Sequence, residues 1–291
     1  MRGEAARRAF ALATALAWSA LSAPAHAAEP LEWNPAWPRF RPSEYVVTGF
    51  AGAASLGIYF GIYNASEPRW TGGILFDEAV RGALREHTRR ALGAARFTSD
   101  LTVLTSLTWT VSIDSLAVPL LRQRSEIAAQ LTLMNVEAFA ISSLITNSMF
   151  KVIGRARPSY QDCERDPYFD SLCHLNDTSS FPSGHTSSAF TAAGLSCAHH
   201  LHLNLYGDRR ADVLACAGSL ALASVTGTLR MVGDRHYLSD VLVGAIIGFG
   251  VGYGVPTLLH YDKGSRVTEA TPTQQPLGLP PPLGPSFSGT F

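Results

Sequence analysis

The chain contains little charge. Asp, Glu, Lys and Arg make up 16% of its 291 residues, against about 25% in an average soluble domain. The 23 basic and 23 acidic residues balance, so the net charge gives no reason to expect a nucleic acid or a strongly acidic partner. The charges that exist are gathered between long apolar stretches, a pattern typical of membrane proteins.

Cysteine is also scarce, with four in the whole chain. Cys163 and Cys173 lie in one polar loop, where they are candidates for a disulfide in an oxidising compartment. The sequence leaves this pairing open, because it does not supply the distance between them. Cys197 and Cys216 lie in apolar stretches, and we interpret both as small buried hydrophobic residues.

The two ends of the chain differ from its middle. Residues 1–27 have a basic start, an apolar centre and the small-residue pattern Ala25-His26-Ala27, which predicts a cleaved signal peptide. The alternative is a membrane anchor that stays attached. Residues 28–43 predict an extended lead-in rich in Pro and Trp. Residues 262–291, rich in Pro, Gly, Thr and Ser, predict a disordered tail.

Residues 44–261 predict an all-α core. Each apolar stretch is close to the roughly 20 residues that cross a bilayer as a helix. We therefore predict a six-helix bundle embedded in a membrane, with a soluble periplasmic bundle as the alternative. Residues 74–92 show helical spacing of apolar and charged residues, which predicts an amphipathic or surface helix. The six apolar stretches are 45–63, 101–121, 127–150, 184–203, 213–229 and 241–259.

A few polar residues interrupt these stretches. Asp114 and Glu137 are acids in predicted spanning helices, and such acids usually face the bundle interior and have a partner. We expect a structural partner for each. The run His199, His200 and His202 resembles a metal-binding pattern, but adjacent histidines on a helix do not share a face. We therefore predict no metal site there.

Three short polar blocks stand at the ends of the apolar stretches. They follow the third stretch, open the fourth and separate the fifth from the sixth. In a bundle of alternating helices these positions lie on one side, so we predict that the blocks form one site. The first block holds Lys151, Arg155, Arg157 and Pro158; the second Pro182, Ser183, Gly184 and His185; the third Arg230, His236 and Asp240.

The blocks contain the groups that bind a phosphate. Arg157 and Arg230 suit bidentate contact with phosphate oxygens, and Lys151 adds a point charge. Ser183 and Gly184 lie where the fourth helix should begin, and the backbone N–H groups of a helix start point toward an anion. These residues predict a phosphate-binding site.

The blocks also contain a nucleophile and an acid. His236 and Asp240 are four residues apart and share a face if a helix begins there. A carboxylate bonded to one ring nitrogen leaves the other nitrogen free to attack phosphorus. His185 is then the candidate that protonates the leaving oxygen.

The three blocks resemble the signature motifs of the type 2 phosphatidic acid phosphatase superfamily. This superfamily includes lipid phosphatases, bacterial non-specific acid phosphatases, glucose-6-phosphatase and vanadium haloperoxidases. Pro182 to His185 match its second motif, and Arg230, His236 and Asp240 match its third. The resemblance implies a six-helix core, a phosphohistidine on His236, a general acid at His185 and no metal or other cofactor.

Two features depart from the family pattern. The family has one residue more between its first Lys and Arg-Pro than the five residues that separate Lys151 from Arg157. Arg155 is therefore a candidate to take over part of the role of Lys151. Leu229 stands where the family has a Ser before the third-motif Arg, which removes one hydroxyl donor. Neither departure touches His185 or His236.

We expect a metal-independent phosphatase that acts on a lipid phosphomonoester or diphosphate, with membrane lipids as its surroundings. A soluble periplasmic acid phosphatase acting on small phosphate esters and a lipid phosphotransferase are alternatives. A vanadate-dependent haloperoxidase or an inactive lipid-binding scaffold are less favoured ones. Nothing in the sequence indicates an oligomeric state.

The expected location is the bacterial inner membrane, but the sequence gives conflicting indications of sidedness. A cleaved signal peptide and the arginines of residues 64–98 place the site in the cytoplasm. A disulfide between Cys163 and Cys173 and the related lipid phosphatases place it outside.

Overall fold

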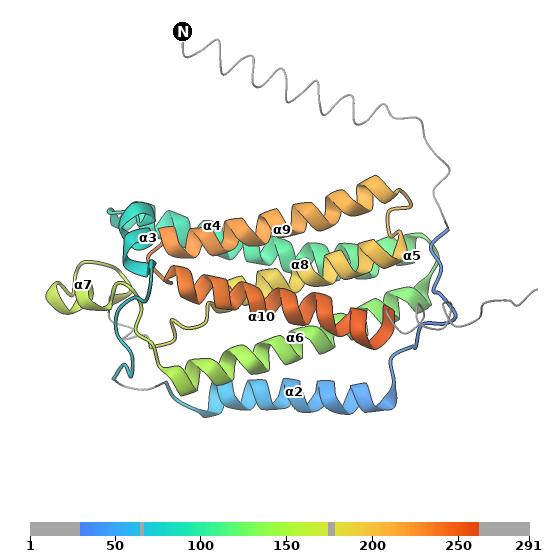
Figure 1. Ribbon diagram of the computed structural model, residues 1–291, viewed down its shortest axis with the longest axis horizontal. Coiled ribbons are helices and arrows are strands. Elements are labelled where there is room, and N and C mark those ends of the chain that lie inside the picture. Colours follow the sequence, from blue (N-terminus) through green and yellow to red (C-terminus); the bar gives the residue numbers. More distant parts are fainter. Residues whose placement is uncertain (1–29, 65–66, 174–177, 262–291) are drawn as a thin grey trace, which may run out of the picture.

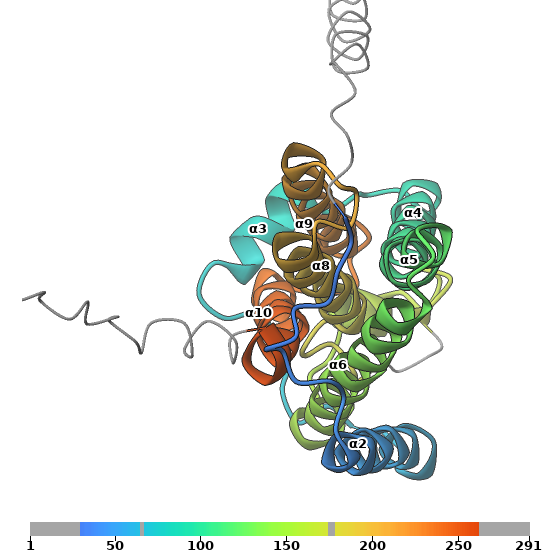
Figure 2. The same cartoon turned by 90° about the vertical axis from the view of Figure 1, so that its right-hand side faces the viewer.

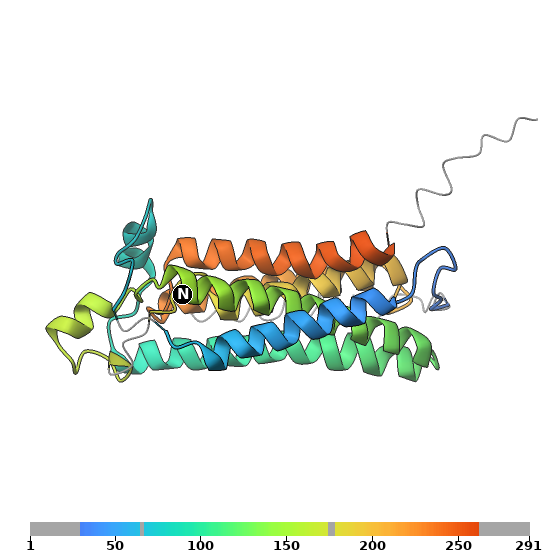
Figure 3. The same cartoon turned by 90° about the horizontal axis from the view of Figure 1, so that it is seen from below.

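The computed structural model describes residues 30–64, 67–173 and 178–261. The predicted signal peptide and C-terminal tail lie outside these residues. Six long helical rods run side by side, with the two short helices at one end (Figures 1 and 3). The long rods are α2 (Pro42–Gly61), α4 (Arg89–Leu107) continued by π-helical η1 (Thr108–Ala117) and α5 (Val118–Leu121), α6 (Ser125–Ile153), α8 (Gly184–Leu203), α9 (Arg209–Val232), and α10 (Leu238–Pro256) continued by π-helical η3 (Thr257–Tyr261); the short helices are α3 (Asp77–Leu84) and α7 (Tyr160–Arg165).

The prediction of an all-helical core is confirmed, but the count of six is wrong. Counted as continuous rods, the described residues form eight helices. Of the two helices beyond the six rods, α3 falls within the helix predicted over residues 74–92, and α7 arises in a polar segment where no apolar stretch marks a helix.

The predicted helix over residues 74–92 is also wrong in extent. It is broken between Leu84 and Arg89, because the side chain of Thr88 accepts a hydrogen bond from the backbone N–H of Ala91 and caps a new helix.

Helix α8 lies at the centre of the bundle. It packs against α4, α6, α9 and α10, while α2 lies on the outside against α6 (Figure 2). Its buried positions are mostly small, including Ala189, Ala192 and Ala193, and small residues let neighbouring helices approach closely.

The closest approach is between α8 and α10, along a stripe of glycines on α10 at every fourth position. A Cβ atom added to Gly248 would lie 2.2 Å from the carbonyl oxygen of Ser187, and one added to Gly244 would lie 2.6 Å from that of Ser183. Gly252 makes the same kind of backbone contact. No residue with a side chain fits at these positions, so the register of α10 against α8 is fixed.

Four helices are long and apolar enough to cross a membrane: Arg89–Leu121, Ser125–Ile153, Arg209–Val232 and Leu238–Tyr261. They expose large apolar side chains such as Leu104, Leu214 and Ile246, which indicates a membrane protein. Helix α8, predicted as a span, is not among the four, and neither is α2, for which the sequence leaves a crossing of the membrane open. Both are diluted by small and polar residues, and α8 is shielded by its neighbours.

The polar residues inside the bundle differ in how well they are partnered. Asp114 accepts a hydrogen bond of 2.7 Å from the Tyr206 hydroxyl and lies 3.2 Å from Nε2 of His200, so its predicted structural partner is confirmed. Glu137 has no hydrogen-bond partner at Oε2, so the same prediction is wrong for this oxygen. His199 faces Asn135 and Tyr261, away from the partners of His200.

Two disulfides are present in the described residues. Cys163 and Cys173 are bonded to each other, which answers the question left open by the sequence. Cys197 and Cys216 are also bonded, with Cα atoms 4.4 Å apart on α8 and α9. The interpretation of Cys197 and Cys216 as unpaired hydrophobic residues is therefore wrong, because it ignored how two antiparallel helices bring distant positions together.

The glycine stripe gives a test of the packing. Gly248→Ala should lower the thermal unfolding midpoint in detergent, because overpacking costs about 1–3 kcal/mol. Gly250→Ala is the matched control, since a Cβ atom there meets nothing within 4 Å and the gain in helix propensity is the same. Equal midpoints for the two variants would contradict the close contact.

The disulfides give a second test. Alkylation of the denatured, unreduced protein should modify none of the four cysteines, and alkylation after reduction should modify all four. Intact-mass spectrometry measures both numbers. Modification of Cys197 and Cys216 without reduction would show that these helices are not cross-linked.

Candidate active site

The three polar blocks meet at one end of the bundle. The end of α6, the start of α8 and the junction between α9 and α10 all lie beside α3 and α7 (Figure 1). His236 stands in the α9–α10 junction, and His185 stands in the first turn of α8. The side chain of His236 is buried and that of His185 is 38% exposed.

The ring of His236 is held at both nitrogens. Nδ1 lies 2.7 Å from the carbonyl oxygen of Ser180, and Nε2 lies 2.7 Å from a terminal nitrogen of Arg157. A carbonyl only accepts hydrogen bonds, so this network assigns the proton to Nδ1. The lone pair of Nε2 then faces the guanidinium of Arg157, which is where a bound phosphate would lie.

Asp240 does not contact His236 in the predicted way. Its Oδ2 lies 3.7 Å from Nδ1 of His236, beyond hydrogen-bond range. The same oxygen accepts hydrogen bonds from the Ser180 hydroxyl at 2.6 Å and from the backbone N–H of Tyr237 at 2.9 Å. Asp240 thus fixes Ser180, and the carbonyl of Ser180 fixes His236.

Arg155 lies beneath this pair and is fully buried. Its guanidinium donates to Asp240 at 2.5 Å and to Asp77 at 2.9 Å, between the rings of Trp70 and Tyr237. Burial alone would raise the pKa of Asp77, but hydrogen bonds, led by the one from Arg155, lower it. The structure thus places Arg155 behind Asp240, so it is not positioned to replace Lys151.

His185 contacts a residue that sequence analysis missed. Its Nε2 lies 2.9 Å from Oδ1 of Asp100, and Arg230 lies 3.2 Å from the same oxygen. Asp100 belongs to α4 and is 58% exposed at its side chain. In the sequence Asp100 is an isolated acidic residue before an apolar stretch. Such residues are too common for this position to indicate a functional site. Here one carboxylate bridges the candidate acid and a phosphate-binding arginine.

The pKa of each histidine is lowered. Burial and the charge of Arg230 lower the pKa of His185 to about 4, against the opposing effect of Asp100. Burial and the charges of nearby arginines hold the pKa of His236 well below its usual range. A neutral imidazole is the nucleophilic form of a histidine.

Arg235 is another missed residue. Together with Arg157 and Arg230 it lowers the pKa of His236, so three guanidinium groups surround one imidazole. Arg235 directly precedes His236 in the sequence, and this position could have indicated that it lies near the site. This concentration of positive charge suits a phosphate dianion.

The remaining predicted phosphate ligands lie around this centre. Nζ of Lys151 donates to Asn64 at 2.8 Å, beside a cavity of about 380 Å³ that Lys151 and Ser179 help to line. The Ser179 hydroxyl accepts a hydrogen bond from Arg157 at 3.2 Å. Lys151 therefore lines the same cavity as Ser179, the residue that Arg157 contacts.

Ser183 and Gly184 act through the backbone. The Ser183 hydroxyl caps α8 by accepting a hydrogen bond from the backbone N–H of Thr186, and its own N–H donates to the carbonyl of Asp240 at 2.9 Å. A Cβ on Gly184 would lie 3.1 Å from the ring of Phe150. The first turn of α8 offers N–H groups to an anion. The Ser183 hydroxyl acts as an acceptor from Thr186 and keeps its own proton to donate.

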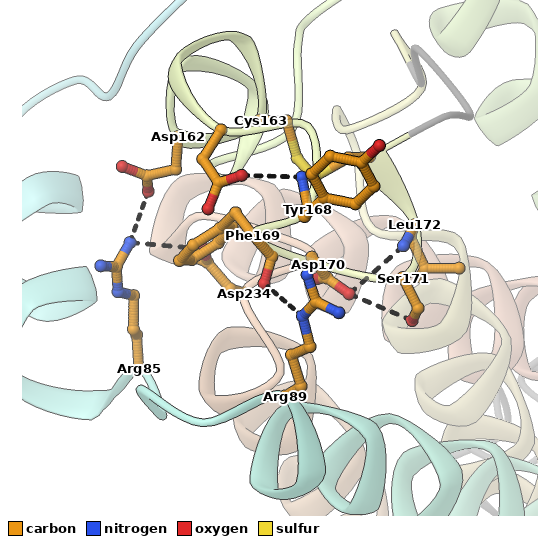
Figure 4. The surroundings of a disulfide bond; sticks show 12 residues. Arg85, Arg89, Asp162, Cys163, Tyr168, Phe169, Asp170, Ser171, Leu172 and Asp234 are labelled. Carbon is orange, nitrogen blue, oxygen red and sulfur yellow. Dashed lines mark hydrogen bonds and ion pairs between the residues drawn. A yellow bond between two sulfur atoms is a disulfide. The ribbon is translucent and has the colours of Figure 1, made fainter.

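Ion pairs hold the surrounding segments in place. Arg81 donates to Asp162 at 2.6 Å and to Asp234 at 2.8 Å, and Arg85 also contacts both acids. Figure 4 shows Arg85 reaching Asp162 close to the disulfide at Cys163. Burial raises the pKa of Asp162, but the hydrogen bonds from the two arginines lower it overall. This network anchors the loop that carries His236.

Comparison with known proteins agrees with this geometry. Residues 132–263 match the family model of the PAP2 superfamily. An 86-residue part of the chain is 43% identical to a lipid A 1-phosphatase from Porphyromonas gingivalis. That match covers 28% of this chain and 18% of the relative, so the chain matches less than a fifth of the curated relative's length. No solved structure matches the chain.

The matched residues contain all three polar blocks and run from α6 to the end of the described chain. The motif spacing, the helical core and the family match agree that residues 132–263 of this chain are similar to the PAP2 superfamily.

Proposed function

We propose that this protein is a phosphatase that hydrolyses a lipid phosphomonoester or diphosphate through a phosphohistidine on His236, without a metal ion in the reaction. The observation that carries the proposal is the setting of Nε2 of His236. Its ring is fixed through Nδ1 by the Ser180 carbonyl, and its Nε2 lone pair accepts a hydrogen bond from Arg157, which must turn to the phosphate when the substrate binds. The nucleophilic nitrogen of His236 and the anion-binding guanidinium of Arg157 therefore lie next to each other, so a phosphate bound by Arg157 would be within reach of the nucleophile.

In the first step Nε2 of His236 attacks phosphorus and the bond from phosphorus to the leaving oxygen breaks. His185 gives its proton to that oxygen, so an alcohol leaves. Arg157 and Arg230 bind the phosphate oxygens, whose negative charge increases in the transition state. Asp100 must then release Arg230 to the substrate.

In the second step His185, now neutral, takes a proton from water, and that water attacks phosphorus. The bond from phosphorus to Nε2 breaks, which frees His236 and releases inorganic phosphate. Throughout, the Ser180 carbonyl keeps the proton on Nδ1, and Asp240 holds Ser180. Asp240 is a positioning residue in this mechanism.

A lipid substrate is supported by two observations. Four candidate spanning helices carry the site at their ends, where the headgroup of a membrane lipid would lie. The relative is a lipid A 1-phosphatase, so a phosphate on a glycolipid headgroup is the first substrate to test. Phosphate release from lipid A, phosphatidic acid, lipid diphosphates and soluble esters would rank the alternatives.

We further propose that the site faces the outside of the inner membrane. The Cys163–Cys173 disulfide lies at the active-site end, and disulfides persist in oxidising compartments. The arginines that suggested the opposite orientation have structural roles. Arg81 and Arg85 pair with Asp162 and Asp234, so these two arginines also have a structural reason to be present at this end of the bundle.

Removing the nucleophile tests the mechanism. His236→Ala should reduce phosphate release by at least about 10³-fold, the scale seen when a covalent nucleophile is deleted. Wild-type protein quenched in alkali with ³²P-labelled substrate should carry label, and the variant should carry none. His87→Ala, at an exposed histidine, is the control. Label on the His236→Ala protein would refute the assignment, whereas label passed to an added alcohol would indicate a phosphotransferase.

The role of Asp100 predicts a change in pH dependence. Asp100 raises the pKa of His185 against burial and Arg230, so Asp100→Asn should lower that pKa further. His185 must be protonated in the first step, and it would lose its proton at a lower pH. The alkaline limb of the kcat/KM profile should therefore move to lower pH. At a fixed pH on that limb, kcat/KM should fall about tenfold for every pH unit that the limb moves.

The competing role for Asp100 is only to occupy Arg230 until substrate arrives. In that case Asp100→Asn would lower KM and leave the alkaline limb in place. The full pH profile of kcat/KM, measured beside KM at one pH, separates the two roles.

A further inference from the structure

Three ionisable side chains meet inside the bundle, away from the polar blocks. Glu44 comes from the first turn of α2, Glu137 from α6 and His260 from η3. One ligand atom of each lies within 4.8 Å of the others, and all three side chains are buried. Helix α2 begins, and η3 ends, at the end of the bundle opposite the active site (Figure 1).

This cluster contains polar atoms that the protein does not satisfy. Oε2 of Glu137 has no hydrogen-bond partner, and the residue is 1% exposed. The hydroxyls of Thr48 and Thr257 are also buried without a partner. Thr48 lies one helical turn after Glu44, on the same side of α2, and Thr257 belongs to the same short π-helix as His260. Buried polar atoms normally have partners, and here several in one region lack them.

The histidine is oriented as a metal ligand is. Nδ1 of His260 lies 2.9 Å from the carbonyl oxygen of Pro38, so it donates its proton there. Nε2 is thereby directed toward the carboxylates, 3.5 Å from Glu44. A backbone carbonyl on the second nitrogen is the usual support of a metal-binding histidine. The π-helical turn that carries His260 is itself a feature common at functional sites.

The charged groups around Glu44, Glu137 and His260 are compatible with a bound cation. Arg41 donates to Glu44 at 2.7 Å, so one carboxylate already has a positive neighbour. Oε2 of Glu137 has no hydrogen-bond partner among the described residues, and Arg41 acts on Glu137 only through its charge. One imidazole nitrogen with two carboxylates is a ligand set that suits a first-row divalent metal.

We propose that Glu44, Glu137 and His260 bind one divalent metal ion of the zinc or manganese class. Zinc, with bonds of about 2.1 Å, holds its ligand atoms about 3.4 Å apart, so side-chain movements of about an ångström complete the site. The ion joins α2 to α6 and to the end of α10. It is structural and separate from the phosphate chemistry, which uses the opposite end of the bundle.

Elemental analysis of the full-length protein, purified in detergent without chelator, tests this proposal. The wild type should hold close to one zinc or manganese ion per chain. Glu137→Gln should remove the ion. Glu126→Gln is the matched control on the same helix, since Glu126 is exposed and pairs with Arg39, and it should keep the ion. Chelation should lower the thermal midpoint of the wild type and the control, and added zinc should restore it.

A second measurement uses the wild type alone, so it gives a result even if the Glu137→Gln variant does not fold. Cobalt added to the chelated protein should give visible absorption bands of a protein-bound ion, and zinc should displace them. The proposal is overturned if the wild type holds no ion and neither cobalt nor zinc binds it. It is equally overturned if zinc shifts the midpoints of wild type and Glu137→Gln alike. A proton on Glu137 would then hold the cluster together.

Discussion

The backbone contact between α8 and α10 determines the geometry of the active site. Because Gly244 and Gly248 admit no side chain, the first turn of α8 lies directly against the first turn of α10. The Ser183 N–H then reaches the Asp240 carbonyl, which joins the second motif to the third through the backbone. The apolar length of α10 serves the membrane, and its glycines set the position of the catalytic groups.

Arg155 extends this rigid unit to the first motif. Its guanidinium binds Asp240 from one side and Asp77 from the other, so α3 and α10 share one buried cation. A buried charge is tolerated only when its partners are well placed. Arg155 and Ser180 together therefore hold Asp240 in place. The carbonyl of Ser180 in turn accepts a hydrogen bond from His236 and orients its ring. Catalytic orientation here depends on residues that never contact phosphate.

The sequence predicted the features that depend on local pattern. The helical core follows from apolar stretches, and the gathering of the three blocks at one end follows from helix alternation. It did not predict the disulfide between Cys197 and Cys216 or the contact of His185 with Asp100, because both join residues on different helices. The spacing of the glycines on α10 was visible in the sequence. That they contact the backbone of α8 could not be predicted, because the sequence does not show which helix packs against them or in which register.

The two ends of the bundle differ in how their charges are balanced. At the active-site end, Arg81 and Arg85 have carboxylate partners, whereas Arg157 and Arg230 are directed at His236 and at the exposed Asp100. Positive charge held there without a matching buried acid favours a substrate dianion over water. At the other end two buried carboxylates, Glu137 and Glu44, lie together with one arginine, Arg41, paired to Glu44. Each imbalance is costly in a folded chain unless an ion of opposite sign completes it, so the charge pattern that identifies the phosphate site also singles out the cluster around Glu137.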